Sequence, residues 1–270
     1  MQRPDDQNDP SAGGGDSAGI APAPLGEALL GALAFFTRLP LRPATHHPLA
    51  ATLAGFAPAG ALIGLIVGLA LAGFGGLGLP TLLAALLAIG CGLILTGALH
   101  EDGLADCADA LGRADRDQAL AIMRDSRLGS FGALALILSV ALRAASLAML
   151  PGWVALAALI GAHSFSRAIL GIVLERLQPA RADGLGASAG TPSRSDAMLA
   201  LAVGAGIAVL AGLLFAGIGA SLFALVVGGI VALGGLEVAR RRFGGYTGDV
   251  LGALQQIVET AMLVAFTASY

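Results

Sequence analysis

The sequence predicts an all-α fold, a polytopic bundle of transmembrane helices. Three observations support this prediction: 56% of the 270 residues are hydrophobic, only 12% are charged, and the mean hydropathy is +0.83. Soluble domains have about 25% charged residues, so this composition indicates a chain whose main partner is the lipid bilayer. The 40 glycines favour close packing of helices in lipid. The net charge of −3 gives no indication of nucleic-acid binding.

The N-terminal part of the chain differs from the rest. Residues 1–24 contain no apolar run and are rich in Gly, Ser, Asp, Pro and Ala, which predicts a disordered tail rather than a signal peptide. Residues 25–37 are apolar but too short to span a bilayer, so we expect one short interfacial or re-entrant helix. Prolines within residues 38–48 end that helix. Residues 25–270 are predicted to form a single integral membrane domain.

About seven spans follow, because the remaining chain contains seven apolar runs of about 20 residues. The predicted spans are 49–73, 79–98, 129–150, 152–174, 197–217, 219–238 and 251–269. The chain has 15 arginines and no lysine, and 13 of the arginines lie in the N-terminal segment or in three of the loops between spans. By the positive-inside rule these loops are cytoplasmic, which predicts a multi-pass protein of the bacterial cytoplasmic membrane. The N-terminus is then cytoplasmic and the C-terminus lies on the other side.

The longest charged segment of the chain, residues 99–132, follows the second predicted span. Read as a helix, it places Asp102, Asp106 and Asp109 at positions i, i+4 and i+7, on one face. Three carboxylates on one face repel each other, and a divalent cation such as Mg²⁺ would relieve that repulsion. The alternative is a solvated charged loop between two spans, which the spacing alone makes equally acceptable.

Two arginines follow the acidic face. Arg124 and Arg127 are three residues apart, a spacing that can bind a phosphate group through bidentate hydrogen bonds. Asp125 and Ser126 lie between them. The alternative interpretation is that both arginines anchor the cytoplasmic start of the third span, and the two roles are compatible.

Three ionisable residues fall within apolar runs. Arg167 and Arg143 are costly to place in hydrocarbon, so each is expected to face a partner or a cavity, although Arg167 is close enough to a span end to reach the interface. Glu259 lies inside the last span, where it predicts a polar pocket. Asp249, at the start of that span, is either a helix N-cap or a member of the same site.

Several stretches together resemble one enzyme family. HEDGLADCADALG (100–112) and ALAIMRDSRLGSFG (119–132) are similar to the central signature of the adenosylcobinamide-GDP ribazoletransferase family. FFTRLPL (35–41), HSFSR (163–167) and GYTGDVLGALQQIVE (245–259) match further elements of the same family. The resemblance covers essentially the whole chain after residue 25.

The resemblance implies a late step of vitamin B12 assembly. Adenosylcobinamide-GDP would be joined to the 5′ hydroxyl of α-ribazole, or to α-ribazole 5′-phosphate, with release of GMP and with Mg²⁺ as cofactor. The metal ligands would be Asp102, Asp106 and Asp109. The catalytic residues would be these three and Asp125. The residues that contact substrate or phosphate would be Arg124, Ser126, Arg127, Arg167, Asp249 and Glu259.

Two other functions remain as alternatives. A CDP-alcohol phosphatidyltransferase also uses spaced aspartates at a membrane surface, but the arginine of its DGxxAR signature is missing after Asp102-Gly103. A small-solute transporter would carry charges near the middle of the membrane and show inverted repeats, whereas the acids here gather in a loop. The oligomeric state is not determined by the sequence, and a homo-oligomer is compatible with it.

Overall fold

The computed structural model describes residues 19–113, 115–125 and 127–270. Within these residues every element is helical apart from one isolated β-bridge between Pro179 and Tyr246. The elements, including three short 3₁₀ or π segments (η1–η3), are α1 (Leu25–Phe36), η1 (Leu49–Gly55), α2 (Phe56–Gly76), α3 (Thr81–Thr96), α4 (Leu99–Leu111), α5 (Arg116–Ile122), α6 (Ser130–Met149), α7 (Gly152–Ala168), α8 (Leu170–Arg176), α9 (Gly184–Ser188), α10 (Arg194–Ala211), η2 (Gly212–Ala216), α11 (Ile218–Val238), η3 (Ala239–Phe243) and α12 (Gly248–Thr267).

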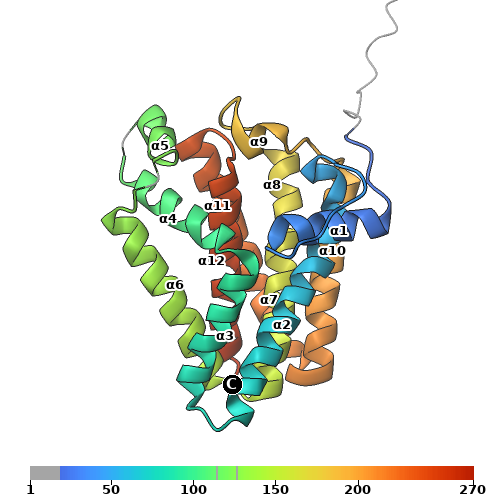
Figure 1. The fold of residues 1–270 in the computed structure, drawn as a ribbon, viewed down its shortest axis with the longest axis vertical. Coiled ribbons are helices and arrows are strands. Elements are labelled where there is room, and N and C mark those ends of the chain that lie inside the picture. Colours follow the sequence, from blue (N-terminus) through green and yellow to red (C-terminus); the bar gives the residue numbers. More distant parts are fainter. Residues whose placement is uncertain (1–18, 114, 126) are drawn as a thin grey trace, which may run out of the picture.

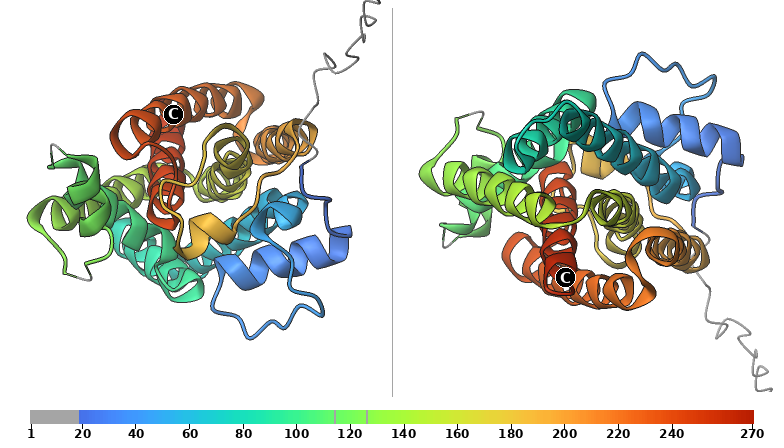
Figure 2. Two further views of the ribbon diagram at one scale, coloured as in Figure 1. Left: turned by 90° about the horizontal axis from the view of Figure 1, so that it is seen from above. Right: turned by 90° about the horizontal axis from the view of Figure 1, so that it is seen from below.

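The helices form the predicted transmembrane bundle (Figure 1). Six segments of the described chain are long and apolar enough to cross a membrane: η1 with α2, α6, α7 with α8, α10 with η2, α11 with η3, and α12. The bent pair of α3 and α4 supplies a seventh if it is counted as one broken span. The prediction of an all-α bundle with about seven spans is therefore confirmed. The short helix predicted at residues 25–37 is α1, which lies across the bundle (Figures 1 and 2).

Two spans occupy the interior of the bundle. The segment that contains α7 has 83% of its most apolar window buried, and α12 has 72%, whereas the corresponding share in α11 is 22%. The end-on views of Figure 2 show α7 surrounded by other helices. Polar side chains on α7 and α12 are therefore shielded from lipid by the protein itself.

Glycines allow the close contacts between these helices. A Cβ atom at Gly60 of α2 would lie 2.1 Å from the carbonyl oxygen of His163 on α7, so only glycine fits there. A Cβ atom at Gly103 of α4 would lie 2.6 Å from the carbonyl oxygen of Asp249, at the start of α12. The second contact brings the acidic helix α4 directly against the first turn of α12.

A sharp break separates α3 from α4. Gly97 and Ala98 both adopt left-handed backbone conformations, with φ of 65° and 54°, and the axes of the two helices differ by 94°. Such a conformation is costly for alanine, since its Cβ crowds the backbone. The break turns α4 across the end of the bundle, next to α5 (Figure 1).

The predicted N-terminal tail is shorter than expected. The Ile20 amide donates to the carbonyl of Thr191 at 3.0 Å, and the Ala23 amide donates to the carbonyl of Ala51 at 2.9 Å. Residues 19–24 therefore pack on the bundle, which the composition of this segment did not predict. Residues 1–18 lie outside the described residues.

Candidate active site

Three carboxylates gather where α4 meets the start of α12. Asp102 is exposed on α4, Asp106 lies half-buried one turn later, and Asp249 is half-buried on the first turn of α12. The pKa of Asp106 is raised to about 6, first by burial and then by the negative charges of Asp102, Asp249 and Asp109. This region is therefore a concentration of negative charge at one end of the bundle.

Asp109 has a structural role that the sequence did not predict. Its two carboxylate oxygens accept hydrogen bonds from the backbone amides of Gly129 at 2.7 Å and Gly132 at 2.9 Å, at the start of α6. An acidic group at this position satisfies free amides of the helix and complements its dipole. Asp109 therefore fastens α4 to α6.

The predicted three-carboxylate metal site is consequently not assembled. Asp102 and Asp109 share a face of α4 but are separated by about 10 Å along the helix axis, too far to bind one ion. Within the described residues, no group of three or more His, Cys, Asp or Glu side chains is placed to hold a metal ion by itself. Both the shared face and the separation along it follow from the spacing, and the prediction of one three-carboxylate site did not take this separation into account.

Asp249 is held in place by residues from a distant loop. Arg181 approaches Asp249 with Nη2 at 3.3 Å from Oδ2, and Thr247 caps α12 by accepting a hydrogen bond from the amide of Val250. Tyr246 and Gln178 form a backbone hydrogen bond that fixes this loop beside α12. Sequence reasoning missed Arg181, since nothing in its loop indicates that it reaches the acidic cluster.

The two arginines of the predicted phosphate clamp point to different carboxylates. Arg124 contacts both oxygens of Asp183 at 2.7 Å, and Arg127 contacts Asp125 at 2.9 Å. Both guanidinium groups are exposed, so the pairs are weak and can exchange partners. The convergent clamp expected from their spacing is not formed. Ser126 lies outside the described residues.

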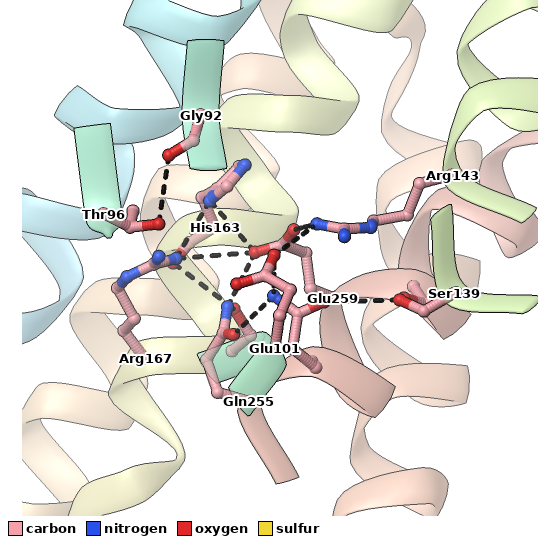
Figure 3. Close-up of polar contacts among 12 residues, drawn as sticks. Gly92, Thr96, Glu101, Ser139, Arg143, His163, Arg167, Gln255 and Glu259 are labelled. Atoms are coloured by element: carbon pink, nitrogen blue, oxygen red, sulfur yellow. Dashed lines mark hydrogen bonds and ion pairs between the residues drawn. The ribbon is translucent and has the colours of Figure 1, made fainter. Parts of the chain in front are cut away.

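Arg167 and Glu259 belong to a buried polar network inside the bundle (Figure 3). Each is 1% exposed, and Arg167 Nη1 lies 3.5 Å from Glu259 Oε2. His163 Nδ1 lies 3.0 Å from the same oxygen, and Arg143 Nη1 lies 3.4 Å from Glu259 Oε1. The partners expected for both buried arginines are thus present. Arg167 and Glu259 face each other in this network, and the contacts with substrate predicted for them stay a prediction.

Glu101 connects the acidic helix to this network. Its Oε1 atom lies 3.1 Å from Arg143 Nη1 on α6 and accepts a hydrogen bond from Gln256 on α12 at 3.0 Å. Sequence reasoning assigned no role to Glu101. The sequence did offer one signal: adjacent residues on a helix point about 100° apart, so Glu101 could not share the face of Asp102. Glu101 points into the bundle while Asp102 faces outward.

A small cavity of about 20 Å³ lies within the network, lined in part by His100, Glu101, Arg143 and Arg167. It has room for a water molecule but not for a substrate. Several of its polar atoms have no hydrogen-bond partner among the described residues, namely His100 Nε2, Glu101 Oε2, Arg143 Nε, Arg143 Nη2 and Arg167 Nε. A buried water would satisfy some of them.

A sequence model of the cobalamin-5-phosphate synthase family matches residues 28–267 of the chain. The chain belongs to this family. The match runs from α1 to the end of α12, so the acidic cluster and the buried network both lie within it. The family assignment favours the transferase interpretation over the phosphatidyltransferase and transporter alternatives.

Relatives of the family cover nearly the same length. An adenosylcobinamide-GDP ribazoletransferase from Azorhizobium caulinodans is 45% identical over 252 residues, which cover 86% of this chain and 92% of the relative. One from Xanthobacter autotrophicus is 44% identical over 263 residues, covering 89% and 95% respectively. One from Allorhizobium ampelinum is 42% identical, covering 86% and 93%. No solved structure matches the chain.

Proposed function

We propose that this membrane protein is an adenosylcobinamide-GDP ribazoletransferase. It would transfer adenosylcobinamide phosphate from adenosylcobinamide-GDP to α-ribazole or α-ribazole 5′-phosphate and release GMP. The observation that carries the proposal is the 40–45% identity to relatives of that name across most of the chain. The carboxylates at the end of α4 support it, because phosphoryl transfer depends mainly on positioning and on charge neutralisation.

The attacking group is proposed to be a ribose hydroxyl other than the 5′ hydroxyl. The family's description names a product that carries a 5-phosphate, so the 5′ position of the acceptor is already occupied when that product forms. A mechanism common to both acceptors therefore uses another hydroxyl, which changes the expectation drawn from the sequence. Its oxygen bonds to the phosphorus next to cobinamide, the bond from that phosphorus to the bridging oxygen breaks, and GMP leaves with that oxygen.

We propose Mg²⁺ as the cofactor, with Asp102 and Asp106 as its protein ligands and Asp249 close by. The pKa of Asp106 supports this: burial raises it first, and the negative charges of Asp102, Asp249 and Asp109 raise it further, with only partial compensation by Arg181. Mg²⁺ prefers oxygen ligands and commonly takes one or two carboxylates, with water and substrate phosphate in the remaining positions. When bound there, the ion would stabilise charge on the diphosphate.

The protein's own groups supply the remaining chemistry. One of the carboxylates of this cluster is the proposed acceptor of the hydroxyl proton, and Asp106, half-buried between Asp102 and Asp109 on α4, is our first candidate. Arg181, which holds Asp249, would also face phosphate oxygens. Arg124 and Arg127, exposed near the same end, are proposed to exchange their carboxylate partners for the guanosine diphosphate.

The test is GMP release by the full-length chain in lipid nanodiscs supplied with adenosylcobinamide-GDP. We expect release to require both α-ribazole and Mg²⁺. Asp102→Asn should lower turnover by about 10²–10³-fold, because it removes the negative charge of one of the two proposed Mg²⁺ ligands. Asp117→Asn, on exposed α5, is the matched control and should leave turnover unchanged.

Three outcomes would contradict the proposal. Release of CMP from a CDP-activated donor, without GMP release, would favour the phosphatidyltransferase alternative. Undiminished GMP release in the presence of a chelator would overturn the role of Mg²⁺. Full activity of Asp102→Asn would overturn the assignment of the site to α4.

A further inference from the structure

A pocket lies directly beside the acidic cluster, between α1, α4, α8 and the start of α12. Its volume is about 160 Å³. Most of its lining is apolar or aromatic, and Asp102 and Asp249 are its two carboxylate-bearing residues. Elements far apart in the sequence build it, so it exists only in the folded bundle.

Aromatic side chains form one wall of this pocket. Phe36 is fully buried and packs edge-on against Phe56 with ring centroids 4.9 Å apart. His100 stacks on Phe36 at 5.6 Å, with an angle of 28° between the rings. Arg167, from the buried network, lies 5.4 Å from the centre of the same phenyl ring. Phe35 packs edge-on against Phe36 at 5.0 Å and is only partly buried, so it is the aromatic ring of this wall that a flat ligand can reach.

The two carboxylates make part of the pocket lining acidic, in contrast to its apolar wall. Both can accept hydrogen bonds from hydroxyl groups, and both repel phosphate oxygens unless a cation lies between. A ligand with an uncharged aromatic part and several hydroxyls matches this distribution of apolar and acidic groups.

The geometry points to this pocket as the subsite for the acceptor, with its planar heteroaromatic base against Phe35 and its ribose hydroxyls at Asp102 and Asp249. This inference rests on the proposed function and adds to it the place of the acceptor. Asp102 then lies between the acceptor hydroxyl and the diphosphate, where the two substrates must meet.

Size and polarity exclude other occupants. Pockets for drug-sized ligands usually measure about 300–1,000 Å³, so this one suits a single fused ring system rather than a corrin macrocycle. A lipid acyl chain would fit the apolar wall but would leave Asp102 and Asp249 facing hydrocarbon, which is unfavourable. A nucleoside satisfies both parts of the pocket, with its base on the apolar wall and its ribose hydroxyls at the carboxylates.

Leu99→Trp tests the inference, since Leu99 lines the pocket and is 37% exposed, so a larger ring can enter the pocket without disrupting the core. Leu111→Trp is the matched control, because it lies on the same helix, is 44% exposed and lines a different pocket. Using GMP release in nanodiscs, we expect Leu99→Trp to raise the acceptor KM by about tenfold or more. The donor KM should stay unchanged in both variants, and Leu111→Trp should keep the wild-type acceptor KM.

A binding measurement separates this inference from the proposed function. Saturation-transfer NMR with benzimidazole alone should detect binding to the wild-type chain and to Leu111→Trp, but not to Leu99→Trp. If the wild-type chain binds benzimidazole without ever releasing GMP, the proposed function fails, and the pocket is a binding site for a flat heteroaromatic ring but not an acceptor subsite. If GMP is released but the two variants have equal acceptor KM values, the subsite is wrong. A raised donor KM, or a co-purified lipid lost only from Leu99→Trp with an unchanged acceptor KM, would also overturn it.

Discussion

Charged residues occur in two settings in this molecule, with different consequences. Inside the bundle, Arg143 and Arg167 share Glu259, and each charged group has a partner on another helix. In the loops, Arg124 pairs with Asp183 and remains exposed to solvent. An unpaired charge is costly in the bundle interior but is hydrated in a loop. The buried set therefore specifies how the helices meet, whereas the loop set stays free to exchange partners.

The largest effect that distinguishes these settings is expected from Glu259→Ala. The substitution leaves two arginines buried without the carboxylate they share, at a cost of about 3–5 kcal/mol. We expect most of the protein to be lost as aggregate, with a strongly lowered unfolding midpoint in detergent for the remainder. Asp183→Ala is the control and should not change the midpoint. Equal unfolding midpoints for the two variants would show that the buried ion pairs contribute no more to stability than the exposed ones.

The pH dependence of turnover is the next effect in size. The pKa of Asp106 lies at about 6, above its ordinary value, so this group is protonated below pH 6 and cannot accept a proton or bind a cation. With Mg²⁺ well below saturation, turnover should rise about tenfold per pH unit below 6 and level off above it, and saturating Mg²⁺ should move this rise to lower pH. In the Asp106→Asn variant, residual activity should lack this rise. A rise that persists unchanged in that variant would assign it to another group.

A smaller effect on stability is expected at Asp109, which is partly buried and so is intermediate between the buried network and the exposed loop pairs. Asp109→Ala removes the side chain that accepts from the amides of Gly129 and Gly132, so we expect a loss of about 1 kcal/mol in unfolding free energy. Turnover should fall only a few-fold. A loss as large as that of Asp102→Asn, at unchanged stability, would restore Asp109 to the metal site.

The smallest effect on stability is expected from Arg127→Ala. This arginine is exposed and contacts only Asp125 among the described residues, so the unfolding midpoint should not change. If Arg127 binds the donor, its KM should rise while kcat stays the same. An unchanged KM would leave the arginine as a surface charge.

The sequence predicted those features that depend on local pattern. The spans followed from runs of about 20 apolar residues, and the shared face of Asp102 and Asp106 followed from helical periodicity. The break at Ala98 was not predictable, because alanine gives no local signal for a left-handed conformation. The partners of Asp109 and Arg181 were also missed, since they depend on tertiary contacts with α6 and α12.

The break after α3 also concerns the surrounding membrane. With 16 residues, α3 is about 24 Å long, whereas the hydrocarbon core of a bilayer is about 30 Å thick. In a bilayer of that thickness α3 alone is about 6 Å too short to cross the hydrocarbon core, so the depth at which α4 begins would depend on the thickness of the local bilayer. A bilayer with longer acyl chains would create hydrophobic mismatch at this point, and lipid composition would thereby influence how readily water-soluble nucleotides reach Asp102.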